Sequence, residues 1–411
     1  MPAHYASVLI VTRRYPPEML GGVESRFQVI AETASNMGHR VRVLITERAA
    51  SSEARNANLR LSGLGWDYNG IWHPLRLRRS LANALVEIEK PTVAWVANPQ
   101  LVGSLKAVWS DVPVILMPGQ VRSLDAMSCV RRLNSNYRRA GGRFASSWAL
   151  HDIAFRRGIR HSDLVAVPCH HQKAVITSGL SWAANKTRVL PRGIKTEMWN
   201  ACRRKRKGDD GAPLKLLVAC RLHPLKNLPM AVQAVGHAAR NGVLVELRIV
   251  GSGSEESAIR ELTASLKLDE RVQYFPSTHD VQQHYHWADA FIMCSHNELF
   301  GNTVLEAIAS GCPVLLRENS PPDVVIGCWD CVRDCPAVIP FPAHGELGLA
   351  EAIQRMKCTP GYLAQLADEA TRWSDRLDWQ HCLSEYLDPQ STSGHECELI
   401  NQAEEELIID G

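Results

Sequence analysis

Short apolar segments alternate with amphipathic helical segments along most of this chain, and this alternation restricts the possible folds more than any other feature. The apolar run SVLIV is followed by the turn-rich TRRYPPEMLGG, by a helical pattern over 23–39 that Gly38 ends, and by the strand pattern RVRVLI. This order is a βαβ unit. Further strand patterns continue the series at 92–97, 112–117 and 164–168. We therefore expect a parallel sheet with helices on both faces.

A second series of the same kind begins at residue 214. Its strand patterns are LKLLVA, VELRIVG, VQYF, AFIMCS and PVLL, and helical patterns lie between them. The length of 411 residues also exceeds the size at which one hydrophobic core stops growing, about 250–300 residues. The sequence thus predicts an α/β protein with two doubly wound domains. Ligands of such sheets bind beyond the carboxyl ends of the strands, so we expect the active site in a cleft between the domains.

The two series are separated by the hydrophilic stretch NACRRKRKGDDGAP, residues 200–213, which contains five consecutive basic residues. We interpret this stretch as the interdomain linker. A nucleic-acid-binding or nuclear-targeting function is the alternative, but we favour the linker and expect no nucleic-acid partner. The last residues, HECELINQAEEELIIDG, are acidic and lack core signals, so we expect a flexible tail.

Twelve cysteines are spread over the chain, mostly as single residues in apolar surroundings such as Cys220, Cys294 and Cys312. This usage is typical of reduced core thiols rather than of a disulfide framework. Zinc and iron–sulfur sites usually need four ligands, and no fourth ligand stands at a matching spacing from the only cluster. We favour a plain loop there, with metal binding as the alternative. The clustered residues are Cys328, Cys331 and Cys335.

The apolar runs are all far shorter than the roughly 20 residues that span a bilayer. The amino-terminal segment MPAHYASVLIVTRR has no basic region before its apolar run, which argues against a cleaved signal peptide. From these two observations we expect a cytoplasmic protein.

Charge is distributed unevenly along the chain. Residues 1–210 contain 32 Lys and Arg against 15 Asp and Glu, whereas residues 211–411 contain 14 against 28. The segment 131–160 alone has eight arginines and one aspartate, interleaved with aromatic residues. It can be a surface for anionic lipid or another polyanion, which would place the protein on the inner face of a membrane. It can equally be a solvated helical face, or attract the acidic half of the same chain. The aromatic residues are Phe144, Trp148 and Phe155.

Two loops at the ends of predicted strands carry charged residues suited to a ligand. Arg221 and Lys226 follow LKLLVA, and two cations on one loop suit a diphosphate. Glu298 follows AFIMCS, and Glu306 lies in the next helix, whose first amides can bind an anion. Both carboxylates can therefore face one cleft, and paired carboxylates also act as acid and base in glycoside hydrolysis. An ordinary surface residue is the alternative for each of the four.

The segment VGSGSEE follows another predicted strand and begins a helix. It lacks the third glycine of a dinucleotide-binding motif and occurs late in the chain, which makes a dehydrogenase the least favoured enzyme class. We interpret Gly251 as part of a tight turn that brings backbone close to a ligand phosphate.

Taken together, these segments resemble the retaining glycosyltransferases of family 4, which have the GT-B fold. The resemblance is carried by YPPEMLGGVE, GHRVRVL, VLPRGIKTEMW, ACRLHPLKN, LRIVGSGSE, RVQYF, HWADAFIMCS, ELFGNTVLEAIASGCPVL and DWQHCLSEYL, in this order. The most specific part is the pair of glutamates separated by seven residues and followed by A-x-A-x-G-x-P-V. The resemblance extends from the first strand to about residue 388.

The resemblance implies four parts of the chain: an acceptor-binding Rossmann-like domain over 1–190, a nucleotide-sugar-binding Rossmann-like domain over 191–370, a helix over 371–390 that packs back on the first domain, and a flexible tail over 391–411. The two Rossmann-like domains would face a central cleft.

The resemblance also implies roles for individual residues. Glu298 would contact hydroxyls of the donor sugar and Glu306 the ribose of the nucleotide. Arg221 and Lys226 would bind the diphosphate, where fixed cations stabilise a leaving group as its charge develops. The remaining donor-binding positions would be the glycine loop Gly21 and Gly22, Gly251, and the start of the helix at Phe300, Gly301, Asn302 and Thr303.

The sequence departs from the family pattern at three places. Many relatives have an acceptor-side histidine where this chain reads Pro118, Gly119 and Gln120, so the base that deprotonates the acceptor is unassigned. Arg192 and Lys195 replace an asparagine and an aspartate around the interdomain glycine. In YFPST, a proline and a serine replace a glycine after the strand, which leaves the nucleotide base open.

We therefore expect a transferase that moves a sugar from a nucleotide-diphosphate sugar to a glycan, a lipid-linked or a small-molecule acceptor in polysaccharide or glycoconjugate biosynthesis. No Asp-x-Asp pair is present, so we expect neither a metal nor another cofactor. The alternatives are an inactive sugar-nucleotide-binding relative and a sugar-nucleotide epimerase of the same architecture.

Overall fold

The computed structural model describes residues 6–16, 22–48, 51–65, 73–119, 145–190, 192–206, 211–278, 280–321, 323–343 and 345–387. All structural statements below concern these residues. The chain divides into two compact units. Unit 1 contains the described residues up to Arg192 and again from Trp379, and unit 2 contains those from Gly193 to Asp378.

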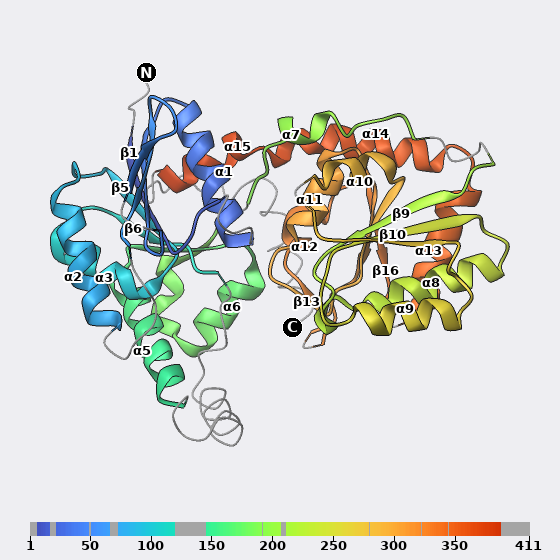
Figure 1. Ribbon diagram of the computed structural model, residues 1–411, viewed down its shortest axis with the longest axis horizontal. Coiled ribbons are helices and arrows are strands. Elements are labelled where there is room, and N and C mark those ends of the chain that lie inside the picture. The colour runs from blue at the N-terminus through green and yellow to red at the C-terminus, as the bar shows by residue number, and fades with distance from the viewer. Residues whose placement is uncertain are drawn as a thin grey trace. The chain divides into compact units, whose positions relative to one another are not determined.

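The sheet of unit 1 has the strand order β3-β4-β2-β1-β5-β6-β7-β8 (Figure 1). Neighbouring strands are parallel except β3 and β4, which are antiparallel at one edge. The strands are β1 Ser7–Thr12, β2 Arg40–Ile45, β3 Ser51–Ala54, β4 Leu59–Gly63, β5 Val93–Val96, β6 Val114–Leu116, β7 Leu164–Val167 and β8 Thr187–Val189.

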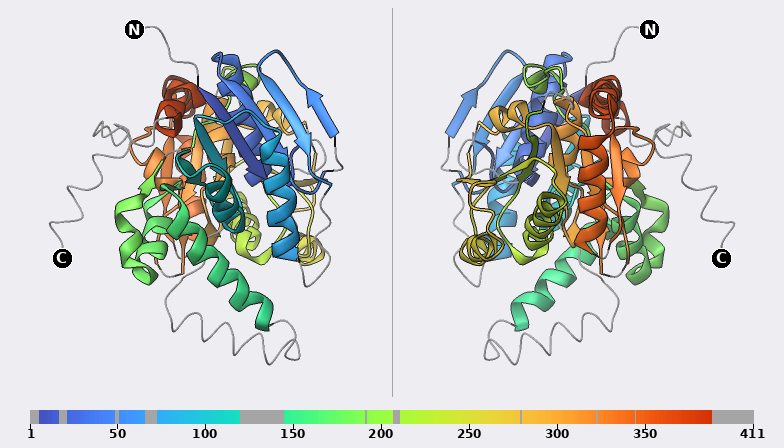
Figure 2. Two further views of the ribbon diagram at one scale, coloured as in Figure 1. Left: turned by 90° about the vertical axis from the view of Figure 1, so that its left-hand side faces the viewer. Right: turned by 90° about the vertical axis from the view of Figure 1, so that its right-hand side faces the viewer.

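Apolar side chains on both faces of the central strands explain why helices cover both faces of this sheet. In β1, Val8 and Ile10 pack on one side with α1, while Leu9 and Val11 pack on the other with α2 and α3. Helices α3 and α5 lie side by side (Figure 2). The helices are α1 Gly22–Asn36, α2 His73–Val86, α3 Pro99–Val108, α5 Ala145–His161, α6 His170–Gly179 and the 3₁₀ helix η1 Ser181–Lys186.

The main sheet of unit 2 is entirely parallel and has the order β11-β10-β9-β12-β14-β16. A second, two-stranded parallel sheet joins β13 and β15. The strands are β9 Leu214–Ala219, β10 Val245–Val250, β11 Val272–Phe275, β12 Ala290–Met293, β13 Asn297–Glu298, β14 Val314–Arg317, β15 Val325–Ile326 and β16 Val338–Phe341.

Helices also cover both faces of the main sheet of unit 2. One core holds apolar residues of α8, α9 and α13, and the other holds those of α10, α11 and α12. This doubly wound α/β fold confirms the predicted fold class. The helices are α7 Glu197–Asn200, η2 Pro224–Lys226, α8 Leu228–Arg240, α9 Glu256–Ser265, α10 Gln282–Trp287, α11 Asn302–Ala309, α12 Trp329–Val332, α13 Glu346–Cys358, α14 Tyr362–Ser374 and η3 Asp375–Leu377.

The last described helix, α15 Trp379–Leu387, belongs to unit 1 although it follows unit 2 in the chain. Its Trp379 and Tyr386 are almost fully buried in the core that contains α1 and β1. The indole of Trp95 donates a hydrogen bond to the Tyr386 carbonyl, and the Tyr386 hydroxyl donates to the Leu190 carbonyl. The acidic stretch 391–411 lies outside the described residues.

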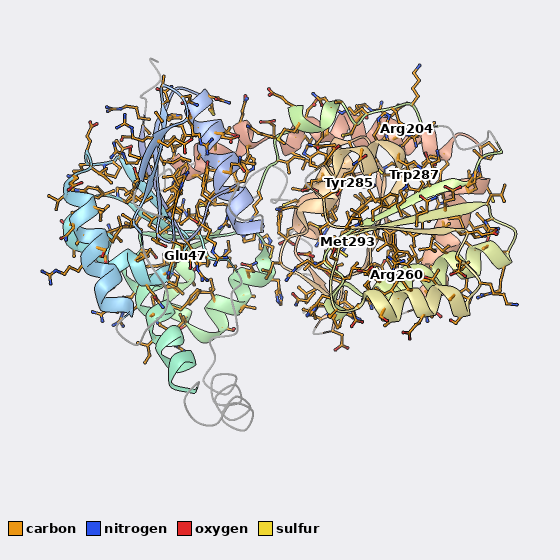
Figure 3. The ribbon with its side chains drawn as sticks, in the orientation of Figure 1. Glu47, Arg204, Arg260, Tyr285, Trp287 and Met293 are labelled. Carbon is orange, nitrogen blue, oxygen red and sulfur yellow. The ribbon has the colours of Figure 1, made fainter. Side chains whose placement is uncertain are left out.

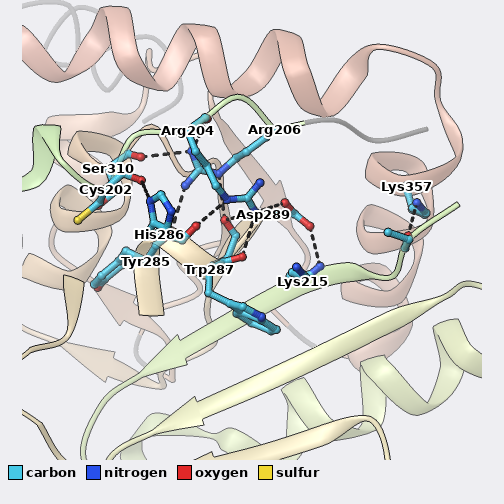
Figure 4. Close-up of polar contacts among 12 residues, drawn as sticks. Cys202, Arg204, Arg206, Lys215, Tyr285, His286, Trp287, Asp289, Ser310 and Lys357 are labelled. Carbon is cyan, nitrogen blue, oxygen red and sulfur yellow. Dashed lines mark hydrogen bonds and ion pairs between the residues drawn. The ribbon is translucent and has the colours of Figure 1, made fainter. Parts of the chain in front are cut away.

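The interpretation of residues 200–213 as the interdomain linker is wrong. The unit boundary lies at 192–193, and the arginines of the stretch are built into unit 2. Arg206 is almost fully buried and donates to the carbonyls of Tyr285, Ala288 and Ser310, at the ends of α10 and α11 (Figure 4). Carbonyls at a helix C-terminus lack partners within the helix, and cations satisfy them. The hydrophilic composition therefore reflects helix capping.

The neighbouring arginines act in the same way. Arg204 donates to the carbonyls of His286 and Trp287 and pairs with Asp289, while Arg203 donates to the Ala309 carbonyl. Figure 4 shows Arg204 and Arg206 converging on the end of α10. The three arginines of this basic run are thus buried or half-buried hydrogen-bond donors, whereas Lys205 is exposed.

The clustered cysteines Cys328, Cys331 and Cys335 lie in the apolar core of unit 2 beside Ile326 and Val332. Cys331 lies in the short helix α12, while Cys328 lies in the turn before it and Cys335 in irregular structure after it. Within the described residues, no three His, Cys, Asp or Glu side chains are grouped so that they could hold a metal ion. None of the described helices is both long and apolar enough to cross a bilayer.

Candidate functional site

The candidate site of unit 2 lies where the strand order of its sheet reverses. The chain passes from β9 outward to β10 and β11, and then returns to β12 on the other side of β9. The carboxyl ends of the two strands at such a reversal, here β9 and β12, are the usual ligand position in sheets of this type. Arg221 and Lys226 stand on the loop that follows β9 and Glu298 on the one that follows β12.

The Lys226 ammonium forms an ion pair with the Glu298 carboxylate between the loops that follow β9 and β12. The two side chains are 16% and 20% exposed, so the pair is largely shielded but still reachable from solvent. Arg221 stands on the same loop as Lys226, directly after Cys220, the residue that follows β9. Arg221 is exposed. The structure thus brings Lys226 and Glu298 into contact and places Arg221 on the loop of Lys226.

The backbone of the Lys226 loop is held by the neighbouring strand. Lys226 ends the short helix η2, and Asn227 follows in the left-handed conformation with φ of 50°. The Cys294 thiol donates to the carbonyls of Lys226 and Asn227, and the His296 amide donates to the Leu225 carbonyl at 2.8 Å. The cation therefore projects from a turn that is fixed to the end of β12.

Gly251 begins the loop after β10, and its backbone conformation and surroundings explain why a glycine stands there. It has φ of 151°, and a Cβ at this position would lie 1.8 Å from the Cys220 carbonyl oxygen. A Cβ at Gly253 would lie 2.2 Å from the Leu222 carbonyl oxygen. Both glycines thus permit close contact between the loops after β9 and β10. This contact shapes the loop that carries Arg221.

Glu298 lies in the two-stranded sheet, where β13 pairs with β15. Three residues later Gly301 adopts φ of 85° as the N-cap of α11, and a Cβ there would come within 3.3 Å of Glu298 Cγ and Cys328 Sγ. Phe300 is buried in the core. Asn302 and Thr303 form the first turn of α11, where unpaired amides and the helix dipole favour an anion.

Glu306 lies one turn into α11 and is half-buried. The hydroxyl of Tyr285, on α10, is 3.1 Å from its Oε2 and 3.2 Å from the Thr303 carbonyl oxygen. Burial raises the pKa of Glu306 to about 7, an effect that the hydrogen bond from Tyr285 partly offsets. Figure 3 labels Tyr285 at the helices of unit 2. Glu306 can therefore change its charge near neutral pH.

Arg317 was not proposed from the sequence, yet it supports the loop between β12 and Glu298. Only 3% exposed at the end of β14, it donates to the carbonyls of Cys294 at 3.1 Å and Ala343 at 2.7 Å, and lies 3.1 Å from His296 Nδ1. Burial lowers the pKa of its guanidinium. The signal in the sequence was an arginine that ends the apolar strand PVLLR, a position where an unbonded charge would be costly.

The residues proposed in unit 1 are only partly described. Gly21 and Gln120 lie outside the described residues, while Gly22 is the first residue of α1. Pro118 and Gly119 follow β6 directly. Near them the buried Arg26 of α1 donates to the Met117 carbonyl at 2.8 Å, at the carboxyl edge of the sheet.

The basic segment 131–160 is described from residue 145 onward, and Phe144 lies outside this part. Nothing is described of the Trp148 side chain. Phe155 is not part of a surface as expected, because it is 6% exposed and packs in the core of unit 1. Arg157 and Arg160 of α5 are exposed.

Two family models match the chain. Residues 20–198 match the model described as Glycosyltransferase Family 4, and residues 203–354 match the one described as Glycosyl transferases group 1. The first match lies in unit 1, apart from its last few residues, and the second lies within unit 2. Together they include every residue that was proposed for the site.

Among named relatives, a D-inositol 3-phosphate glycosyltransferase of Streptomyces bingchenggensis is 30% identical over 190 residues, which are 44% of this chain and 40% of the relative. A second of the same name, from Saccharomonospora viridis, is 27% identical over 221 residues and half of each chain. The chain thus matches about half or less of the length of these relatives.

Solved structures share the fold at low identity. Sucrose-phosphate synthase from Thermosynechococcus elongatus superposes with a TM-score of 0.67 at 16% identity, over 93% of this chain and 97% of that one. The Anabaena protein Alr3699/HepE, solved in complex with UDP and glucose, gives 0.64 at 16% identity over 93% and 98%.

Proposed function

Because this chain belongs to the family 4 glycosyltransferases, whose fold is GT-B, we propose that it is a retaining transferase that moves one sugar from a nucleotide-diphosphate sugar to an acceptor. The observation that carries the proposal is the ion pair between Lys226 and Glu298 at the reversal of the strand order in unit 2, with Arg221 on the same loop as Lys226.

The chemistry of sugar transfer suits this arrangement. When the bond between the sugar and the diphosphate breaks, the sugar becomes oxocarbenium-like and the leaving group gains negative charge. Lys226, Arg221 and the first amides of α11 would face that charge, and fixed groups of this kind stabilise a transition state without reorganisation. Glu298 would bind hydroxyls of the donor sugar.

The nucleotide would bind with its ribose at Glu306, because a carboxylate accepts hydrogen bonds from two neighbouring hydroxyls. UDP is bound by the structural relative Alr3699/HepE, which makes a uridine nucleotide the first donor to test. We propose that the protein's own cations neutralise the diphosphate, so that the reaction needs no metal and no other cofactor.

For the acceptor we propose a glycan, lipid-linked or small-molecule hydroxyl compound in polysaccharide or glycoconjugate biosynthesis. The relatives named for transfer to D-inositol 3-phosphate support an acceptor that is small and anionic. We also propose that unit 1 contacts an anionic membrane surface from the cytoplasmic side. The support is the exposed Arg157 and Arg160 of α5, together with Trp182, which is 46% exposed and lies under the Arg160 guanidinium.

The test is incubation of the purified chain with UDP-glucose, ADP-glucose and GDP-mannose, with and without D-inositol 3-phosphate, followed by measurement of nucleoside diphosphate release. Release with one donor, stimulated by an acceptor and unchanged by EDTA, is the expected result. Loss of turnover in EDTA that magnesium restores would contradict metal independence.

The same experiment separates two other functions. Tight binding of a sugar nucleotide without any release would indicate an inactive relative, an alternative favoured by Pro118 and Gly119 at the place where many relatives have a histidine. Conversion of a sugar nucleotide into its epimer, without nucleoside diphosphate release, would indicate an epimerase.

A further inference from the structure

The Tyr285 hydroxyl lies within hydrogen-bond distance of two acceptors, Glu306 Oε2 at 3.1 Å and the Thr303 carbonyl oxygen at 3.2 Å. A phenol has a single proton to donate, so it can serve only one of them at a time. The side chain cannot move away to resolve this, because its ring is fully buried between Trp199 and Phe291, with centroids 5.2 and 5.8 Å away.

The protonation state of Glu306 decides which acceptor the phenol serves. If Glu306 is protonated, its own O–H donates to the Tyr285 oxygen, and Tyr285 donates to the Thr303 carbonyl. If Glu306 is ionised, it has no proton to give, and Tyr285 turns its proton to the carboxylate, which is the stronger acceptor. In the neutral state, both contacts of the Tyr285 oxygen are hydrogen bonds. In the ionised state, the phenol donates only to Glu306, and that single hydrogen bond is charge-assisted.

The ionisable groups around Tyr285 leave the protonation of Glu306 as the change that decides which acceptor the phenol serves. In the described part of the chain, the ionisable groups that act on Tyr285, besides Glu306, are the thiols of Cys202 and Cys312. Burial raises the pKa of both thiols, which are therefore neutral near pH 7. The nearby Arg206 is occupied with helix carbonyls, including that of Tyr285.

We propose that Tyr285 is a positioning residue for Glu306, and that its one proton turns from the Thr303 carbonyl to the Glu306 carboxylate when the ribose of a nucleotide binds. This inference rests on the proposed function, because it assumes that Glu306 receives the ribose. The proton that Glu306 carried leaves to solvent, and the ribose hydroxyls take its place as donors to the carboxylate. Nucleotide binding is therefore coupled to the release of a proton.

The test is calorimetric titration of the donor that turns over in the panel, taken from UDP-glucose, ADP-glucose and GDP-mannose, in two buffers of different ionisation enthalpy. A sugar nucleotide is the suitable probe because, unlike a free nucleoside diphosphate, its phosphates lose no proton near neutral pH. We expect about one proton to be released per nucleotide bound at about pH 6. Affinity should fall about tenfold per pH unit below about pH 7 and stay constant above it.

The variant Tyr285→Phe removes the hydroxyl and keeps the ring between its neighbours. Because the hydrogen bond that stabilises the carboxylate is lost, the pH at which affinity begins to fall should rise by about one unit. At about pH 9 the variant should approach the affinity of the wild type. Glu306→Gln should bind more weakly and without pH dependence. Tyr274→Phe, which removes a hydroxyl bonded to Thr263 on another face of unit 2, should retain the wild-type profile.

Three outcomes would overturn the inference. One is a wild-type affinity that is independent of pH between about pH 5.5 and 8.5. Another is equal loss of affinity at every pH in Tyr285→Phe, which would show a packing role only. The third is an absence of binding by every donor, which would also overturn the proposed function. Turnover with pH-independent binding would leave the proposed function intact and remove only the coupling.

Discussion

The Lys226 ammonium pairs with the Glu298 carboxylate between two neighbouring strand-end loops, although the two residues were proposed for different parts of one substrate. Without a nucleotide, each charge is compensated by the other. A diphosphate would draw the ammonium toward itself, while hydroxyls of the sugar would take its place beside the carboxylate. The ion pair therefore keeps two mostly shielded charges in position before the substrate arrives.

Replacing Lys226 or Arg221 with Ala should reduce turnover by about 100-fold, because both cations face a leaving group whose charge grows as the sugar bond breaks. Steady-state kinetics with the active donor measures this, and the loss should lie mainly in kcat. Arg240→Ala, which removes an exposed cation from the end of α8, is the matched control and should retain normal turnover. Near-normal rates in both Lys226→Ala and Arg221→Ala would mean that the diphosphate lies elsewhere.

Glu298→Ala should change the discrimination among donor sugars while the affinity for free nucleoside diphosphate stays the same or rises. The reason is the ion pair, since Lys226 loses its internal partner and becomes fully available to phosphate. Competition titrations of UDP against UDP-glucose and UDP-galactose would show the effect. A large loss of affinity for UDP itself would assign Glu298 to the nucleotide rather than the sugar.

Arg206→Met should destabilise unit 2 by about 3 kcal/mol or more, because it leaves several buried helix carbonyls without donors, each worth about 1 kcal/mol or more. Chemical denaturation is the measurement. Lys205→Ala changes the adjacent, exposed residue of the same basic run and should shift the free energy of unfolding by less than about 0.5 kcal/mol. Equal effects of the two changes would mean that the hydrogen bonds of Arg206 to the helix carbonyls contribute little to the stability of unit 2.

The fold class could be predicted from the sequence because both central sheets are built from strands that are apolar on two faces. The alternation of these strands with helical segments left little choice of architecture. The antiparallel edge strand β3, SSEA, was missed since polar edge strands carry almost no apolar pattern. The buried arginines were misread for a related reason. Composition alone cannot distinguish a solvated cation from one that caps a helix.

The site was predictable to the extent that its residues follow strands. Lys226 and Glu298 form an ion pair and Arg221 stands on the loop of Lys226, because the carboxyl ends of neighbouring parallel strands meet. Arg317 and Tyr285 act on the site from the end of β14 and from α10. The arginine that ends PVLLR signals a charge in need of partners without saying which, and nothing in the local sequence of Tyr285 marks a polar role. Their contacts depend on which strands become neighbours, and this emerges only from the three-dimensional fold.

The protein should sediment with anionic vesicles at low salt and remain in the supernatant at high salt. Each basic residue near such a surface contributes about 1 kcal/mol, and salt screens this attraction. Replacing Arg157 and Arg160 together with Glu should abolish most binding. The same change at Lys267 and Arg240, exposed in unit 2, should leave it unchanged. An absence of binding to phosphatidylserine vesicles at low salt would remove the membrane proposal.

Glu306→Gln should stabilise the nucleotide-free protein at alkaline pH and leave its stability at acidic pH nearly unchanged. Burial raises the pKa of Glu306 from 4.5 to about 7, so the folded state binds this proton more tightly than the unfolded state does. The stability contributed by the protonated carboxyl is complete below about pH 4.5 and is lost as pH rises through about 7. A neutral amide avoids that loss, which we put at about 1 to 3 kcal/mol. Urea denaturation of both proteins at about pH 5 and about pH 8.5 measures the difference. A variant that is less stable than the wild type at the higher pH would show that the Glu306 carboxylate is well stabilised in the fold without any ligand.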